Sequence, residues 1–139
     1  MGLSQEVKQM VSEAIGENNR RFADAAARRD ARAMASVYAD DAELLPPEME
    51  ALKGQEAIER FWQGGIEMGI RSIEFETLRL EYADCLRLAC EVGRYTLRIQ
   101  SDDSALETDV GKYLVVHRHQ PDGSWRRAVE IFNSNASVP

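Results

Sequence analysis

The residues from Leu86 to Gln100 read LRLACEVGRYTLRIQ, a β-rich run with two contrasting faces. Side chains of a strand alternate, so the even positions from Arg94 to Gln100 share one face and the odd positions share the other. From Ala89 to Ile99 the odd face is apolar apart from one carboxylate, Glu91. A carboxylate on an apolar face is costly unless it is paired or protonated, and such groups are enriched at functional sites. Glu91 is therefore either a functional residue or a structural one, paired with an arginine or placed at the rim of an interface.

Three further β-rich runs surround this segment, at 73–82, 108–119 and 125–133. Their short, turn-forming connections leave no room for crossover helices, so we expect an antiparallel meander. In the third run, Lys112 and Arg118 mark the even face, and the opposite face carries Tyr113, Val115, His117 and His119. In the last run, the alternation of faces does not decide which residues point inward. The two possible sets are Ala128, Glu130 and Phe132, or Val129, Ile131 and Asn133.

Before residue 73 the apolar residues recur at the spacing of a helix instead. Apolar positions recur through a first helix that Ser4 can cap and that ends near Arg29. Asp30 can cap a short second helix reaching Tyr38, and a third helix follows Gly54. Between them we expect a turn at 40–41 and a brief strand at 42–45, stopped by prolines. Helices followed by long strands indicate a single α+β domain over residues 1–139.

Composition excludes several classes of protein. The net charge of −7 argues against a protein that binds the nucleic-acid backbone. No apolar run approaches the roughly 20 residues that cross a bilayer, and the polar N-terminus does not resemble a signal peptide. Cys85 and Cys90 would lie roughly 16 Å apart on opposite faces of one strand, too far to bridge. Two unpaired thiols predict a cytoplasmic protein.

The motifs give no support for a cofactor. The sequence has no phosphate-binding glycine loop, no Gly-x-Ser-x-Gly and no Cys-x-x-Cys. His117 and His119 could project two imidazoles to one side, but spacing identifies no third ligand. We therefore expect neither a cofactor nor a metal, and His117 is more simply a core or interface histidine.

Several segments together resemble one known family. They are RFADAAARRD at 21–30, VYADDAELLP at 37–46, GQEAI at 54–58, EVGRY at 91–95, GKY at 111–113 and GSWR at 123–126. Their order and spacing resemble the SnoaL-like domains of the nuclear-transport-factor-2-like superfamily, which includes the ketosteroid isomerases. The resemblance implies a cone-shaped fold in which three N-terminal helices pack on a strongly curved antiparallel sheet around a pocket. It also implies a homodimer through the other face of the sheet.

The resemblance orients the last strand, because the family pattern turns Ala128, Glu130 and Phe132 into the pocket. It implies a small hydrophobic ligand, with polar contacts from Glu130, Glu91 and His117, the candidate catalytic residues. The expected lining residues are Phe22, Tyr38, Leu45, Trp62, Tyr95, Tyr113, Val115, Ala128 and Phe132. Across adjacent strands about 4.8 Å apart, we expect Glu91, His117 and Glu130 to converge on one cavity, with a carboxylate hydrogen-bonded or raised in pKa by burial.

The chain departs from the ketosteroid isomerases at their catalytic positions. Leu45 stands where the resemblance places the catalytic aspartate, Phe22 where it places the donor tyrosine, and Val115 near the second donor acid. We therefore do not expect ketosteroid isomerisation. A different cofactor-independent acid–base reaction remains, such as isomerisation, dehydration or cyclisation, with Glu130 or Glu91 as the base and His117 or a tyrosine as the proton donor. The alternatives are a non-catalytic binding module and an association domain.

Overall fold

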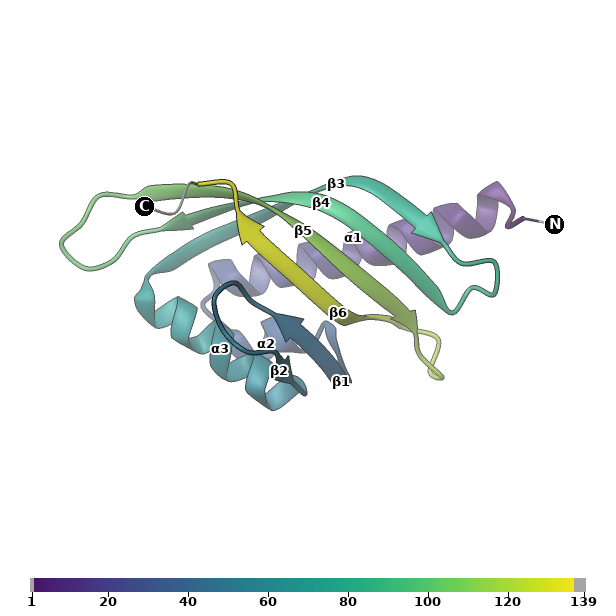
Figure 1. Ribbon diagram of the computed structural model, residues 1–139, viewed down its shortest axis with the longest axis horizontal. Coiled ribbons are helices and arrows are strands. Elements are labelled where there is room, and N and C mark those ends of the chain that lie inside the picture. Colours follow the sequence, from purple (N-terminus) through teal and green to yellow (C-terminus); the bar gives the residue numbers. More distant parts are fainter. Residues whose placement is uncertain (1, 137–139) are drawn as a thin grey trace.

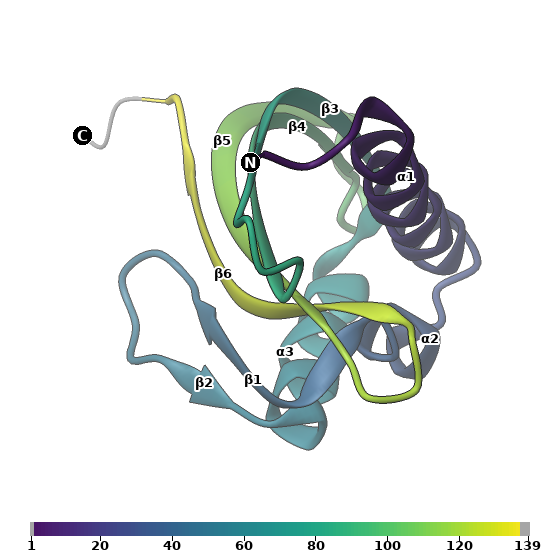
Figure 2. The ribbon, with the colours of Figure 1, turned by 90° about the vertical axis from the view of Figure 1, so that its right-hand side faces the viewer.

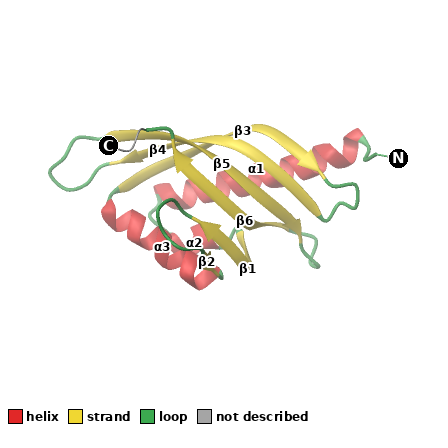
Figure 3. Ribbon diagram, viewed as in Figure 1, coloured by secondary structure: helices red, strands yellow, loops and turns green. Residues whose placement is uncertain are grey.

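The computed structural model describes residues 2–136, which contain three helices and six strands (Figures 1 and 3). The helices are α1 (Gln5–Ala27), α2 (Ala31–Ala35) and α3 (Gln55–Met68). The strands are β1 (Tyr38–Leu45), β2 (Leu52–Lys53), β3 (Ile70–Tyr82), β4 (Leu88–Ile99), β5 (Glu107–His119) and β6 (Trp125–Ser134). The predicted α+β class, with helices preceding long strands, is confirmed.

The first two helices begin at the predicted capping residues. The Ser4 side chain accepts a hydrogen bond from the Val7 backbone N–H at 3.2 Å, and Asp30 accepts one from Ala33 at 3.0 Å. These caps satisfy backbone donors that the first turn of a helix leaves without partners. α3 continues through Gly64 and ends at Gly69, where φ is 116° and a Cβ would lie 2.4 Å from the Gln100 carbonyl oxygen. Only glycine fits this turn into β3.

The region between α2 and α3 differs from the prediction. The second helix ends at Ala35, and Asp40 and Asp41 lie within β1 and not in a turn. The pairing of β1 with β6 shifts register between Tyr38 and Glu43, and the two aspartates project into solvent at this irregularity. Two consecutive aspartates therefore give the sequence pattern of a turn, although the backbone here stays extended. The two-residue strand β2 is too short for any periodic signal.

The sheet has the order β2-β1-β6-β5-β4-β3. Strands β3 to β6 form the predicted antiparallel meander, with β6 beside β5. One pair departs from the antiparallel arrangement, because β1 runs parallel to β6. Figure 2 shows β3, β4 and β5 curving over one side of the molecule, with the helices on their concave face.

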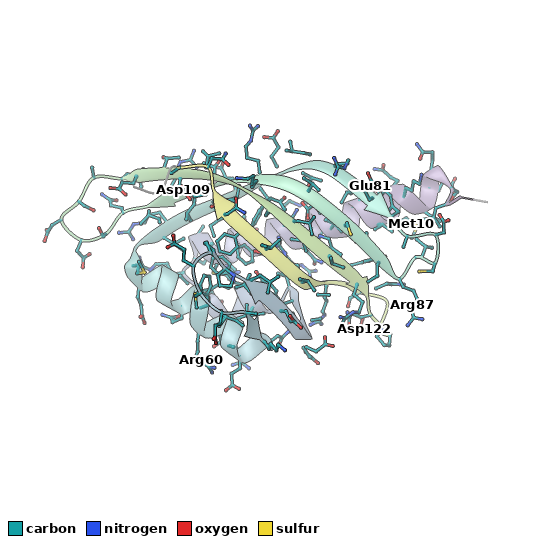
Figure 4. The ribbon with its side chains drawn as sticks, in the orientation of Figure 1. Met10, Arg60, Glu81, Arg87, Asp109 and Asp122 are labelled. Atoms are coloured by element: carbon teal, nitrogen blue, oxygen red, sulfur yellow. The ribbon has the colours of Figure 1, made fainter. Side chains whose placement is uncertain are left out.

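The main core fills the space between the concave face and the helices. It combines residues of all three helices with β1 and the start of β3, including Phe22, Tyr38 and Trp62. Figure 4 shows Arg60 on the outer side of α3 and Glu81 on the far side of the sheet, so both layers place charge in solvent. No helix within residues 2–136 is long and apolar enough to cross a membrane.

Candidate functional site

A buried polar network crosses the concave face of the sheet, and Glu91 lies at one end of it. Its side chain is 0% exposed. Oε2 accepts hydrogen bonds from the hydroxyls of Tyr113 at 2.6 Å and Thr77 at 2.7 Å, and from the Asn19 amide at 3.0 Å. Oε1 lies 2.8 Å from His117 Nε2. Four partners from α1, β3 and β5 thus compensate for the desolvation of this carboxylate.

The partners of Glu91 also decide its ionisation. Burial alone would raise the pKa of Glu91, but the hydrogen bond from His117, the charge of Arg127 and the hydrogen bond from Tyr113 lower it to about 2. The expectation that a carboxylate here is hydrogen-bonded is met, whereas a pKa raised by burial is not found for Glu91. At neutral pH the group is a carboxylate that only accepts hydrogen bonds.

His117 is neutral in this environment. Burial lowers its pKa, and the hydrogen bond to Glu91 offsets the effect only in part. Because Glu91 is ionised, the proton of the imidazole belongs on Nε2, which donates to Glu91 Oε1. Nδ1 is then a buried acceptor, and it has no hydrogen-bond partner among residues 2–136.

Arg127 is the centre of the network, and sequence parity did not find it. Its guanidinium is 0% exposed, donates to Asn19 Oδ1 at 2.7 Å, and forms an ion pair with Glu130 Oε1. The rings of Phe22 and Phe75 lie 5.2 and 5.0 Å from its Cζ, within the range of cation–π attraction. Asn19 therefore links the two carboxylates, through Glu91 on one side and Arg127 on the other.

A β-bulge in β6 explains the burial of Arg127. Val116 pairs with Val129, but the next residue, His117, pairs with Arg127, so Ala128 is the additional residue of β6. A bulge shifts the alternation of faces by one residue. Arg127 and Glu130, three positions apart, therefore both face inward, although a regular strand would place them on opposite faces.

Glu130 lies at the other end of the network and is 3% exposed. Its Oε1 accepts a hydrogen bond from the Tyr38 hydroxyl at 2.9 Å in addition to the contact with Arg127. Trp62 Nε1 donates in turn to the Tyr38 oxygen at 3.3 Å. Burial and the adjacent charge of Glu130 raise the pKa of Tyr38 well above its usual value, so its hydroxyl stays protonated as a donor. No hydrogen bond reaches Oε2 of Glu130 from the part of the chain that the structure describes.

A small apolar cavity adjoins this end of the network. Its walls are Trp62, Ile73, Phe75, Tyr95, Leu97, Tyr113, Glu130 and Phe132. The volume of the cavity is about 40 Å³. This is room for about three waters at 10–15 Å³ each. Glu130 is the only charged residue among the eight. The cavity thus presents one carboxylate to an otherwise aromatic and aliphatic space.

Two reciprocal pairs on β4 and β5 form part of this wall. Gly93 pairs with Tyr113, and Tyr95 pairs with Gly111. A Cβ added at either glycine would lie 2.3 Å from atoms of the tyrosine opposite. Each ring therefore lies over a glycine, and each hydroxyl is held by an acid, Tyr95 by Asp109 at 3.1 Å and Tyr113 by Glu91.

The structure brings Glu91 and His117 into direct contact and places Glu130 in the same network, but only Glu130 lines the cavity. Of the expected lining residues, four contribute to the wall: Trp62, Tyr95, Tyr113 and Phe132. The other five are absent from it: Phe22, Tyr38, Leu45, Val115 and Ala128. Apart from the half-buried Leu45, these five are buried in the core behind the wall.

The prediction missed Asn19 and Arg127 in the network, and Ile73, Phe75 and Leu97 in the wall. Asn19 did carry a signal, because it falls four residues after Ile15 and three before Phe22 on the apolar face of α1. A polar side chain at such a position requires a buried partner.

The two histidines do not form a pair. His119 stacks on Trp125 with ring centroids 4.9 Å apart, and its Nε2 lies 3.1 Å from the Gly123 carbonyl oxygen. Within residues 2–136, no three His, Cys, Asp or Glu side chains are placed to share a metal ion. Cys85 is exposed and Cys90 half-buried, both as free thiols.

Comparisons with solved structures agree with the fold. A hexachlorocyclohexane dehydrochlorinase (LinA type 2) superposes with a TM-score of 0.80 at 16% identity, covering 98% of this chain and 93% of that one. A putative scytalone dehydratase from Novosphingobium aromaticivorans gives 0.78 at 12% identity, with 97% and 91% covered. A putative calcium/calmodulin-dependent protein kinase II association domain from Xanthomonas campestris gives 0.70 at 19% identity, with 99% and 91% covered.

At these identities the similarity shows the fold alone. No curated protein matches the chain. The model of the SnoaL-like domain matches residues 19–132, which include the whole network from Asn19 to Glu130 and the complete cavity wall. The chain belongs to the SnoaL-like domain family.

Proposed function

We propose that this chain binds a small molecule in the cavity between α3 and the concave face of the sheet, and that Glu130 is the polar group that contacts it. One observation carries the proposal. Glu130 is the single carboxylate on the cavity wall, with Oε1 fixed by Tyr38 and Arg127 and with Oε2 free of protein hydrogen bonds within residues 2–136. A fixed polar group in a small apolar pocket is typical of a ligand site.

We further propose that the bound molecule undergoes acid–base chemistry without a cofactor. Glu130 Oε2 would take a proton from a carbon of the substrate, while Arg127 and Tyr38 hold the carboxylate in one orientation. The same carboxyl would then return the proton to another atom of the substrate, or a leaving group would depart from the substrate. Two of the structural neighbours, a dehydrochlorinase and a putative dehydratase, support this class of reaction.

In this proposal Glu91 and His117 have a supporting role. Both are 0% exposed, and neither lines the cavity. Glu91 fixes the hydroxyl of Tyr113, whose ring forms part of the wall, and fixes Asn19, which orients Arg127. Our expectation that either residue acts directly on the substrate is therefore replaced by a positioning role.

The binding test compares two variants that add similar bulk at different places. Leu97→Phe fills the cavity, whereas Leu78→Phe changes an exposed leucine of β3 that is 57% exposed. Each protein is incubated with a mixed metabolite extract, and the retained molecules are identified by native mass spectrometry. We expect the unmodified protein and Leu78→Phe to retain the same compound and Leu97→Phe to lose it. Equal retention by all three proteins would place the ligand elsewhere.

We also propose that the chain forms a homodimer through the convex face of the sheet. Leu114 pairs with Val92 on one side and Ile131 on the other, and this row faces away from the helices. Leu114 and Ile131 are 39% and 43% exposed in the single chain. The neighbouring row is also apolar, with Val116 between Cys90 and Val129. A contiguous apolar patch on a sheet is typical of an interface.

The second candidate function is a non-catalytic association domain. The small volume of the cavity and the apolar convex face favour it, and one structural neighbour is described as a putative association domain. The extract experiment separates the two, because an association domain would retain no compound in any of the three proteins.

A further inference from the structure

We propose that the ligand of this cavity is a small organic cation, such as a substituted ammonium ion, held by the Glu130 carboxylate and the aromatic faces around it. The inference rests on the proposed ligand site and names the chemical class of its occupant. Three independent features carry it: the ring arrangement, the balance of buried charge, and the geometry of Glu130.

The cavity is bounded by aromatic rings in several orientations. Trp62 and Phe132 are stacked with centroids 6.1 Å apart, Tyr95 meets Phe132 edge to face at 6.0 Å, and Phe75 meets Tyr113 edge to face at 5.4 Å. Together they surround the space with five rings. The face of an aromatic ring carries negative potential and attracts a cation within about 6 Å. One of these rings already does so, because Phe75 lies 5.0 Å from the Arg127 guanidinium.

The buried charge around the cavity is not balanced. The buried charged side chains of residues 2–136 are Glu91, Glu130 and Arg127, and His117 is neutral because burial lowers its pKa. Two carboxylates therefore face one guanidinium. A net charge is costly in a buried region of low dielectric constant, even where each group has hydrogen-bond partners. A cationic ligand would neutralise the cluster, whereas a neutral ligand would enclose the excess negative charge and remove it from water.

Glu130 is the member of this charged cluster that reaches the cavity. Arg127 and Tyr38 both bind Oε1, so neither occupies Oε2. Among the eight wall residues, all within the described part of the chain, Glu130 is also the only charged one. A neutral alcohol would donate a hydrogen bond to Oε2 but would not neutralise the charge of the carboxylate, and an anion would be repelled. The same site therefore distinguishes ligands of equal shape by their charge.

The test uses two compounds of nearly identical shape that match the volume of the cavity, the ethylammonium ion and its neutral analogue ethanol. Binding of each to the purified protein is measured by isothermal titration calorimetry or ligand-observed NMR. We expect ethylammonium to bind at least about tenfold more tightly, because two favourable effects, ring attraction and ion pairing, act on the cation alone. Glu130→Gln should remove most of this difference, after circular dichroism has shown that the variant is folded.

Phe132→Leu provides a second variant that keeps the apolar surface and both buried carboxylates. Removal of one ring face should weaken the binding of ethylammonium by about 2- to 30-fold and leave the affinity for ethanol within about twofold. Ile131→Leu, on the adjacent convex face, should change neither affinity.

The outcomes separate this inference from the proposed function. Equal affinity for the two compounds, or tighter binding of the alcohol, overturns the cation and leaves a ligand site. No binding of either compound at about 10 mM, together with retention of a neutral or anionic compound from the extract, has the same consequence. No binding of either compound and no retained compound at all would overturn both.

Discussion

The ion pair of Arg127 and Glu130 is the residue-scale feature on which the site depends most. Removal of one partner leaves the other charge buried and uncompensated, whereas removal of both does not. We expect Arg127→Met alone to lower the free energy of unfolding by about 3–5 kcal/mol. In the double variant Arg127→Met/Glu130→Leu, the loss should be smaller than the sum of the two single losses by at least about 1 kcal/mol. Urea denaturation of the four proteins measures this coupling, and strict additivity would contradict the pairing.

The environment of His117 predicts a dependence of stability on pH. Burial lowers its pKa below the ordinary 6.5, although Glu91 opposes the effect and Arg127 adds to it. Below pH 6.5 the unfolded chain therefore binds a proton that the folded chain does not, and the free energy of unfolding falls as the pH falls, by up to about 1.36 kcal/mol per unit. His117→Gln keeps a donor for Glu91 but cannot titrate. We expect thermal unfolding at pH 5.0 to 6.5 to show this slope in the unmodified protein and to lose it in the variant.

Glu91 extends the same dependence to more acidic pH. Because its pKa is lowered from 4.5 to about 2, its contribution is complete above pH 4.5 and is lost as the pH falls toward 2. A slope that persists in His117→Gln between pH 5.0 and 6.5 would assign it to other groups.

At this scale, alternation of faces along the sequence was enough to find some residues of the site but not others. Glu91 was visible because a charge interrupts an apolar face. Arg127 was not, because a single bulged residue reverses parity after it and nothing in the sequence marks the position of a bulge. Four predicted lining residues pack behind the wall, because a pattern of apolar positions separates inside from outside but not core from cavity.

At the scale of the element, α3 offers a matched pair of glycines. Gly64 lies within the helix, where an added Cβ would meet no atom within 4 Å, whereas Gly69 ends the helix with φ at 116°. We expect Gly64→Ala to raise the free energy of unfolding by about 0.5–1 kcal/mol through helix propensity. Gly69→Ala should lower it by more than about 1 kcal/mol, because alanine is strained there. Chemical denaturation of both variants tests the boundary of α3, and two changes of the same sign would contradict it.

The elements themselves were largely predictable. Capping side chains fixed the starts of α1 and α2, and alternation identified the four long strands, because both signals are local. The parallel pairing of β1 with β6 was not predictable, since it joins segments about ninety residues apart and depends on the packing of the whole sheet. The two aspartates of β1 misled the prediction because solvated polar residues occur both in turns and at strand irregularities.

At the scale of the whole molecule, the convex face of the sheet predicts assembly. Leu114→Arg places a charge at the centre of the apolar row formed with Val92 and Ile131. We expect light scattering at micromolar concentration to give twice the 15.7 kDa of one chain for the unmodified protein and a single chain for the variant. Met68→Arg, at the end of α3 on the helical side of the sheet and 73% exposed, is the matched control and should remain dimeric. A monomeric unmodified protein would contradict the interface.

The two reciprocal glycine–tyrosine pairs also restrict how this cavity can evolve. A side chain cannot be added at Gly93 or Gly111 while the opposite ring is present, and each ring is held in place through its hydroxyl. A lineage that reshapes the wall must first shorten a tyrosine and only afterwards enlarge its glycine, since the reverse order passes through a clashing intermediate. The four positions therefore form an epistatic unit with a fixed order of substitution. Descendants with a wider pocket should retain the glycines longer than the tyrosines.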